Sequence, residues 1–317
     1  MNYEFETTEE YGYLISSIFG KKLCLYKEED YNSLKQCENL EEFSIKLMKN
    51  YKFITEDMEL TKNEIKKRLN MTLFYEYKSC LKSCQTDLLE IILNYWIGSH
   101  KIHNFFFLLQ SKIADPDLEK SFEKIEIGHF DALKTLKFCK DMHDVRIYCV
   151  ENSFLRNYFY KLKWATEFKD NDFQNSQALF LKYLMEDTFL QLKNREIFMK
   201  EILKTEADRY IVDLTINTLN IKTDRKALFP AITNFDGRTI DSFIKAETIE
   251  DVGRFKSTDF IEKELERYRE SFNIHNDVTC VYSYLKLKEQ EIKNILWIIE
   301  CVLQDRRSEL ENIFGNK

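Results

Sequence analysis

Two cysteines and two histidines are the residues whose types and spacing could bind a metal ion. Cys80 and Cys84 are four residues apart and His100 and His103 are three apart, so that each pair would share one side of a helix. Structural zinc sites use more closely spaced cysteine pairs, and an HxxH spacing places two imidazoles only loosely on one face. We therefore expect packed or exposed side chains here and no metal site.

The rest of the sequence lacks the local patterns that are typical of active sites. Phosphate-binding loops need several glycines, and neither GxxxxGK[ST] nor GxGxxG occurs. A GxSxG elbow, a local Cys/His signature and an aspartate-rich DDxxD motif are also absent. A catalytic triad assembled in space from distant residues stays open. We expect no catalytic residue and no cofactor.

Residues 205–218 place charged side chains beside a nearly continuous apolar run. On a helix, Glu206 and Arg209 are three residues apart, so an ion pair between them is the simplest interpretation. Together with Asp208 and Asp213 they could also pair with a second helix in a partly buried network. The partners that we expect on that helix are Glu289, Gln290, Glu291 and Asn294. Polar residues in apolar helices without catalytic neighbours more often determine how helices pack than perform reactions.

The composition predicts that long helices position these residues. The chain has 317 residues, 44% of them apolar, but only 7 glycines and 2 prolines. Residues that open tight turns and stop helices are therefore scarce. The aromatic residues recur at spacings of three or four, which is typical of the buried face of a helix. We predict an all-α fold without a convincing internal sequence repeat.

Hydrophobic periodicity predicts where the helices of the N-terminal part lie. We expect one helix in residues 11–25, ending near Gly20, and a connection at residues 28–35. Asn39 should cap the next helix. Two long helices should occupy residues 61–109 as a hairpin, with a break at residues 115–117 and a loop-rich bridge at residues 121–130.

The C-terminal part continues the helical pattern, with one interruption. We expect helices in residues 132–139, 145–160, 178–192 and 195–219. Residues 222–239, which contain Pro230 and Gly237, should form an irregular connection or a subdomain border. An apolar stripe from Val281 to Leu303 predicts a closing helix of roughly ten turns.

Charge and cysteine content exclude several classes of partner. The formal net charge is -7 with lysine and glutamate interleaved, so no concentrated basic surface for nucleic acid is expected. The N-terminal residues do not have the pattern of a signal peptide, and apolar runs are far shorter than the roughly 20 residues that span a bilayer. Membrane association should therefore run through protein partners. The eight cysteines lack CxxC pairs and should be free thiols.

Several sequence blocks carry a resemblance to a known family. Residues 284–301 read YLKLKEQEIKNILWIIEC, residues 206–218 begin with EADR, and Asp224 and Arg225 precede a Leu-Phe-Pro string that ends at Pro230. Near the N-terminus, GYL at residues 12–14 and QCE at residues 36–38 complete the set. In this order and spacing, the blocks resemble the subunit d family of vacuolar-type proton ATPases. The departures are Lys293 for the usual arginine, Ile299 for a small residue, and a shortened segment after Pro230.

The resemblance implies a fold and a role. The fold would be a single domain of residues 1–317, a cup-like assembly of helical hairpins with approximate threefold internal repetition. It would sit on the proteolipid c-ring at the cytosolic face of vacuolar or other acidic endomembranes and receive the central-stalk subunits D and F, with subunit a as a further candidate partner. The implied role is that of a non-catalytic rotor subunit that couples ATP hydrolysis to proton transport. A helical scaffold of the same fold that serves another complex is the alternative.

The same resemblance marks the residues that should hold the fold together. These family-motif residues are Glu206, Asp208, Arg209, Arg225, Pro230, Lys288, Glu289, Gln290, Glu291, Asn294, Trp297 and Glu300. We expect them to have structural roles.

Overall fold

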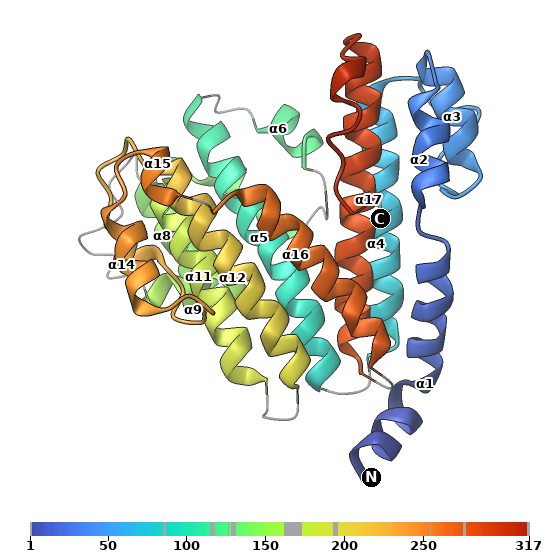
Figure 1. Ribbon diagram of the computed structural model, residues 1–317. Coiled ribbons are helices and arrows are strands. Elements are labelled where there is room, and N and C mark those ends of the chain that lie inside the picture. The colour runs from blue at the N-terminus through green and yellow to red at the C-terminus, as the bar shows by residue number, and fades with distance from the viewer. Residues whose placement is uncertain are drawn as a thin grey trace. The chain divides into compact units, whose positions relative to one another are not determined.

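The computed structural model describes residues 2–84, 87–114, 118–125, 127, 131–161, 173–192, 196–253, 255–274 and 277–315. Within these ranges the regular structure consists of helices without a strand, which confirms the all-α prediction (Figure 1). The chain divides into two compact units, which we call unit 1 (Met1–Leu93 with Ile261–Lys317) and unit 2 (Asn94–Phe260). Among the described helices, none combines the length and the apolar character that crossing a membrane requires.

Unit 1 is organised around its last long helix. It contains α1 (Asn2–Leu23), α2 (Glu28–Lys35), α3 (Leu40–Met48), α4 (Lys62–Lys82) and α17 (Thr279–Leu303). Helix α17 packs against α4, α1 and α2, and Figure 1 shows it in red directly beside α4. Most side chains of α17 are buried, so α17 supplies the centre of the core of unit 1.

The starts of these helices follow from capping residues. Asn39 caps α3 as expected, because its side chain accepts a hydrogen bond from the backbone N–H of Glu42 at 3.0 Å. Thr61 caps α4 in the same way through the N–H of Glu64 at 3.2 Å. The predicted connection at residues 28–35 was wrong, since this segment is α2. Its acidic first turn favours a helix start, and Tyr31 lies on its buried face.

The first and the last long helix of unit 1, α1 and α17, differ in length from the prediction. Helix α1 continues through Gly20 to Leu23, because an exposed glycine weakens a helix by only about 1 kcal/mol and does not stop it. Helix α17 has 25 residues, about seven turns rather than ten. It ends in a Schellman motif, in which the N–H of Arg306 donates to the carbonyl of Cys301 at 2.7 Å and Asp305 has a φ of 54°.

Unit 2 lies on one continuous stretch of chain. It contains α6 (Glu119–Glu123), α7 (Asp131–Lys134), α8 (Met142–Glu151), α9 (Ser153–Lys161), α11 (Phe173–Gln191), α12 (Ile197–Asn217), α13 (Arg225–Leu228), α14 (Gly237–Lys245) and α15 (Ile249–Val252). Helix α11 packs against α9, α12 and α13, and α14 and α15 pack against α12 and each other. Two further helices, α5 (Asp87–Ala114) and α16 (Ser257–Glu270), run from one unit into the other.

Several predicted elements of unit 2 are found with altered boundaries. The expected helix at residues 145–160 is interrupted at Asn152, whose side chain accepts from the N–H groups of Phe154 and Leu155 and starts α9. The expected helix at residues 132–139 is α7 followed by a 3-10 turn. Helix α5 ends at Ala114, and the predicted break at residues 115–117 lies outside the described residues. In the segment predicted to be irregular, residues 222–224 and 229–236 are irregular, whereas α13 and the start of α14 at Gly237 are helical. The two units do not divide at this segment.

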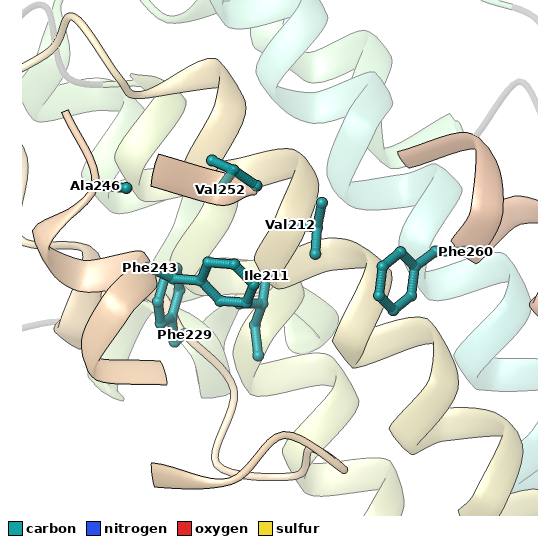
Figure 2. Packing of buried hydrophobic residues seen from close by; sticks show 7 residues of the cluster. All are labelled: Ile211, Val212, Phe229, Phe243, Ala246, Val252 and Phe260. Carbon is teal, nitrogen blue, oxygen red and sulfur yellow. The ribbon is translucent and has the colours of Figure 1, made fainter. Parts of the chain in front are cut away.

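An aromatic cluster fills the centre of the C-terminal part of unit 2 (Figure 2). Its buried members are Ile211, Val212, Phe229, Phe243, Ala246, Val252 and Phe260. The rings of Phe235 and Phe255 pack edge to face with Phe243 at centroid distances of 5.3 and 5.2 Å. Such contacts stabilise beyond the area that they bury. The interpretation of the aromatic residues as packing residues is therefore confirmed for this cluster.

The cysteines take no part in disulfides. All eight are free thiols, and six of them are buried. This confirms the prediction of free thiols, and the six buried ones pack as small apolar side chains.

Candidate functional site

The family-motif residues fall into two groups, one in each unit. The closing-helix group lies on α17 and consists of Lys288, Glu289, Gln290, Glu291, Asn294, Trp297 and Glu300. The loop-anchoring group lies on α12 and in the segment after it and consists of Glu206, Asp208, Arg209, Arg225 and Pro230.

A buried ion pair forms the centre of the closing-helix group. Glu291 is 3% exposed and pairs with Lys288, which is 6% exposed and one helical turn away. The Glu291 carboxylate also accepts a hydrogen bond from the Tyr51 hydroxyl and one from the backbone N–H of Tyr26 at 2.6 Å. The Lys288 ammonium lies 4.1 Å from the centre of the Tyr51 ring. Both buried charges are thus compensated. Tyr26, just before α2, and Tyr51, just after α3, are bonded to α17.

The tyrosines around this pair are held in their neutral form. Burial, reinforced by the negative charge of Glu291, raises the pKa of Tyr51 well above its usual value. Burial likewise raises the pKa of Tyr26 and of Tyr31, with a smaller contribution from Glu291. A phenol with a raised pKa donates a hydrogen bond at neutral pH rather than acting as a base. These side chains are therefore suited to packing and not to proton transfer.

Asn294 uses its whole side-chain amide. Its nitrogen donates to the carbonyl of Phe314 at 2.7 Å and to the Tyr31 hydroxyl at 3.3 Å. Its oxygen accepts from the N–H of Phe314 at 3.3 Å and from the Gln290 amide at 2.9 Å. A side chain with two donors and one acceptor oxygen is satisfied by this set. Asn294 therefore connects α17 both to α2 and to the segment that follows α17.

The remaining members of the closing-helix group lie nearer to the surface. Glu289 pairs with Lys293 at 2.8 Å, and Glu300 pairs with Lys62 at the start of α4. The indole N–H of Trp297, a side chain that is 36% exposed, donates to the carbonyl of Glu309 at 3.0 Å. Half-exposed ion pairs contribute little to stability, commonly less than about 1 kcal/mol. The buried part of the group carries most of its structural effect.

In unit 2, Asp208 anchors the segment that follows the Leu-Phe-Pro string. Asp208 is only 1% exposed. Its carboxylate accepts hydrogen bonds from the Thr233 hydroxyl at 2.5 Å, from the Asn234 N–H at 2.8 Å and from the Asn234 side-chain amide at 2.9 Å. A carboxylate that accepts several hydrogen bonds remains stable when buried. Asp208 thus fixes the course of an irregular loop against α12.

Arg225 joins the C-terminal ends of two helices. Its guanidinium donates to the carbonyl of Thr218 at 2.8 Å, just after α12. It also donates to the carbonyls of Phe243 at 3.1 Å and Ala246 at 2.5 Å, at the end of α14. Positive charge at the C-terminal end of a helix is favourable because the last carbonyls are unpaired. Burial lowers the pKa of Arg225, but a guanidinium stays charged near neutrality.

Glu206 and Arg209 have partners other than each other in the contacts given below, and the expected ion pair between them stays a prediction. Glu206 accepts a hydrogen bond from the Tyr95 hydroxyl of α5 at 2.6 Å. Arg209 pairs with Asp213 at 3.6 Å, one turn further along α12. The expected pairing of these charges with α17 stays a prediction. Pro230 is buried at the end of its string.

The two groups join segments of their own units. The buried carboxylates, amides and guanidinium accept or donate hydrogen bonds within their own unit, as described above. Within the described residues, three or more His, Cys, Asp or Glu side chains do not gather into a cluster that could hold a metal ion. Each group joins segments that are far apart in the sequence, which is the geometry of packing determinants.

Comparison with known proteins gives these groups a context. A model of the family described as "ATP synthase (C/AC39) subunit" matches residues 14–313. Similar curated proteins are V-type proton ATPase subunit d1 of Arabidopsis thaliana, 26% identical over 95% of both chains, and V-type proton ATPase subunit d of Saccharomyces cerevisiae, 24% identical over 95% of this chain and 96% of the relative. Subunit d of Dictyostelium discoideum is also 24% identical, over 96% of this chain and 95% of the relative. The resemblance predicted from the sequence blocks is confirmed, and the chain belongs to the ATP synthase (C/AC39) subunit family.

Proposed function

We propose that this chain is a non-catalytic rotor subunit of a V-type proton-translocating ATPase. The observation that carries the proposal is the family match from residue 14 to residue 313, together with relatives named as d subunits that align over nearly their whole length. In this role the chain transmits torque from ATP hydrolysis on other subunits to proton transport through the membrane sector. Family membership supports the interpretation as a subunit rather than a free-standing enzyme.

The proposal includes the partners and position that the resemblance implies. The chain sits on the proteolipid c-ring at the cytosolic face of an acidic endomembrane, receives the central-stalk subunits D and F, and has subunit a as a further candidate partner. Its association with the membrane runs through these proteins. A single cup-like domain of residues 1–317 with approximate threefold internal repetition belongs to the same proposal.

The contacts inside each unit support a mechanical role. A part that transmits torque must resist deformation, and close-packed helices with few glycines deform little. In unit 1, Glu291 of the buried ion pair on α17 accepts a hydrogen bond from Tyr51. The two residues are 240 positions apart, so this bond ties α17 to a segment near the N-terminus. In unit 2, Arg225 and Asp208 fix an irregular segment to α12. Such cross-links stiffen helices without performing a reaction.

A copurification experiment tests the proposal. The chain, tagged at its N-terminus, is recovered from membranes solubilised in a mild detergent, and its partners are identified by mass spectrometry. We expect proteolipid subunits and the stalk subunits D and F in fixed ratios to the tagged chain. Depletion of the chain should abolish ATP-driven acidification of isolated vesicles, and re-expression should restore it. Recovery with an unrelated set of proteins, combined with normal acidification after depletion, would instead support the helical scaffold of another complex.

A further inference from the structure

The segment after α17 reverses and runs back along this helix. The reversal is the Schellman motif at Asp305, and in Figure 1 the dark red segment beyond it descends beside α17. We call residues 306–315 the strap. Its apolar side chains Leu310 and Ile313 are buried, whereas Glu311 and Asn312 between them are exposed. The strap therefore packs along one side and is not a free end.

Two side chains of α17 bind the backbone of the strap, one at Glu309 and one at Phe314. Asn294 contacts both the N–H and the carbonyl of Phe314, a two-point pairing that resembles the way neighbouring strands bind each other. Trp297 donates to the carbonyl of Glu309 one turn further along α17. Because these bonds go to main-chain atoms, they fix the register of the strap on the helix.

The far end of the strap is fitted to α16. The N–H of Gly315 donates to the Glu262 carboxylate at 3.2 Å, and its carbonyl accepts a hydrogen bond from Arg269. Gly315 has a φ of 70°, a conformation that favours glycine. A Cβ at this position would also lie 2.9 Å from Leu265 Cδ1 and 2.9 Å from Arg269 Nη2. The positive φ therefore favours glycine, and a Cβ at this contact would force the ends of the Leu265 and Arg269 side chains to shift.

The strap also contacts α2, near the other end of the sequence. Lys35 pairs with Glu311 at 3.0 Å, and the Tyr31 hydroxyl accepts a hydrogen bond from Asn294, the same side chain that binds Phe314. Three helices that are distant in the sequence, α2, α16 and α17, thus meet through the strap.

We propose that the strap is a releasable latch that holds α2 and the unit 1 part of α16 on α17. The contacts that close it are a few hydrogen bonds and two buried aliphatic side chains, whereas α4 and α17 share an extensive apolar core. Regions with few buried contacts open at lower free energy than the core does. Opening of the strap breaks the Lys35–Glu311 pair and uncovers Asn294 and Trp297. This loosens α2, which keeps its direct packing against α17, while α4 and α17 stay packed. This proposal concerns unit 1 alone and does not rest on the proposed function.

Hydrogen exchange of the full chain, followed by mass spectrometry, tests the latch. Gly315→Ala disturbs only the far end of the strap, and Asn312→Ala is the matched control because Asn312 is exposed on the same segment. In Gly315→Ala we expect exchange about tenfold faster or more in peptides from the strap and from residues 28–35, with unchanged exchange in α4. Asn312→Ala should exchange like the wild-type chain.

A second pair of variants distinguishes the contacts of Asn294 with the strap from its contact with α2. Asn294→Ala removes both bonds to Phe314 and the bond to Tyr31, whereas Tyr31→Phe removes only the last of these. The latch predicts faster exchange of the strap in Asn294→Ala and little change there in Tyr31→Phe. Fast exchange of the strap in Gly315→Ala with wild-type protection of residues 28–35 would overturn the proposal. A strap in Asn294→Ala that stays as protected as in the wild type would overturn it as well.

Discussion

Replacing Glu291 with glutamine removes one charge of the buried pair in unit 1 and keeps the shape of the side chain. The Lys288 ammonium then has no counter-charge at a position where it is 6% exposed. Removal of one partner of a buried ion pair costs about 3–5 kcal/mol, because the other charge stays buried and uncompensated. Glutamine still offers an acceptor oxygen to Tyr51 or Tyr26, so we expect the free energy of unfolding to fall by about 3 kcal/mol, the lower end of this range.

A double variant distinguishes the effect of the lost counter-charge from general damage to the core. Lys288→Met with Glu291→Gln leaves no charge at the site, so the double variant should regain at least about 1 kcal/mol relative to Glu291→Gln alone. The matched control is Glu270→Gln, because Arg267 and Glu270 form a pair of the same spacing at 2.7 Å with both side chains more than one-third exposed. That control should change stability by less than about 0.5 kcal/mol.

Urea unfolding at pH 7, followed by circular dichroism at 222 nm, measures these differences. If Glu291→Gln is no more destabilising than Glu270→Gln, the buried pair does not stabilise unit 1 as its burial indicates. The single variant Lys288→Met is measured as well. If the losses in free energy of unfolding of the two single variants add up to the loss in the double variant, the two charges are not coupled.

Three other expectations follow from groups described above or buried beside them. Burial raises the pKa of Cys80 to about 11 and of Tyr77 to about 12, so the folded chain keeps protons that the unfolded chain loses. The free energy of unfolding should therefore fall as the pH rises from about 8.5 to 12, by about 1.4 kcal/mol per pH unit for each group in its own range; urea midpoints that stay constant over this range would contradict this. Asp208→Asn replaces one acceptor oxygen that faces the Asn234 donors with an NH2 donor, so the free energy of unfolding should fall by about 1–3 kcal/mol. Amide exchange at residue 234 should become faster, and unchanged exchange there would show that the loop does not depend on the carboxylate. Asp305→Gly relieves a positive φ and should raise the free energy of unfolding by roughly 0.5–1 kcal/mol, and a lower urea midpoint than that of the wild type would refute it.

The helical class and much of the element order were predictable from local pattern. Asn39 as a helix cap and the stripe on α17 are encoded by neighbouring residues, so the sequence alone reveals them. Helix α2 was missed because eight residues hold too few apolar positions for a period to be recognised. The ten turns predicted for α17 exceeded the apolar stripe itself, because the 23 residues from Val281 to Leu303 make only about six turns.

The partners of the motif residues were not predictable from local pattern. Glu291 and Asn294 were identified as packing residues, but Tyr51 is 240 residues away from its partner Glu291. Thr233 and Asn234 lie in the segment that the sequence marked only as irregular and shortened. A single sequence carries no signal for such distant pairings, because they depend on how the helices assemble and not on spacing along the chain.

The division of the chain into a continuous unit 2 and a unit 1 built from two distant stretches affects folding during synthesis. Unit 2 is complete on the ribosome when residue 260 has been made, but α17 follows only with residues 279–303. Until then, the apolar faces of α1 and α4 lack the helix that covers them. Exposed apolar surface of this kind promotes aggregation of nascent chains. The emerging N-terminal helices should therefore depend on chaperones for longer than the helices of unit 2 do.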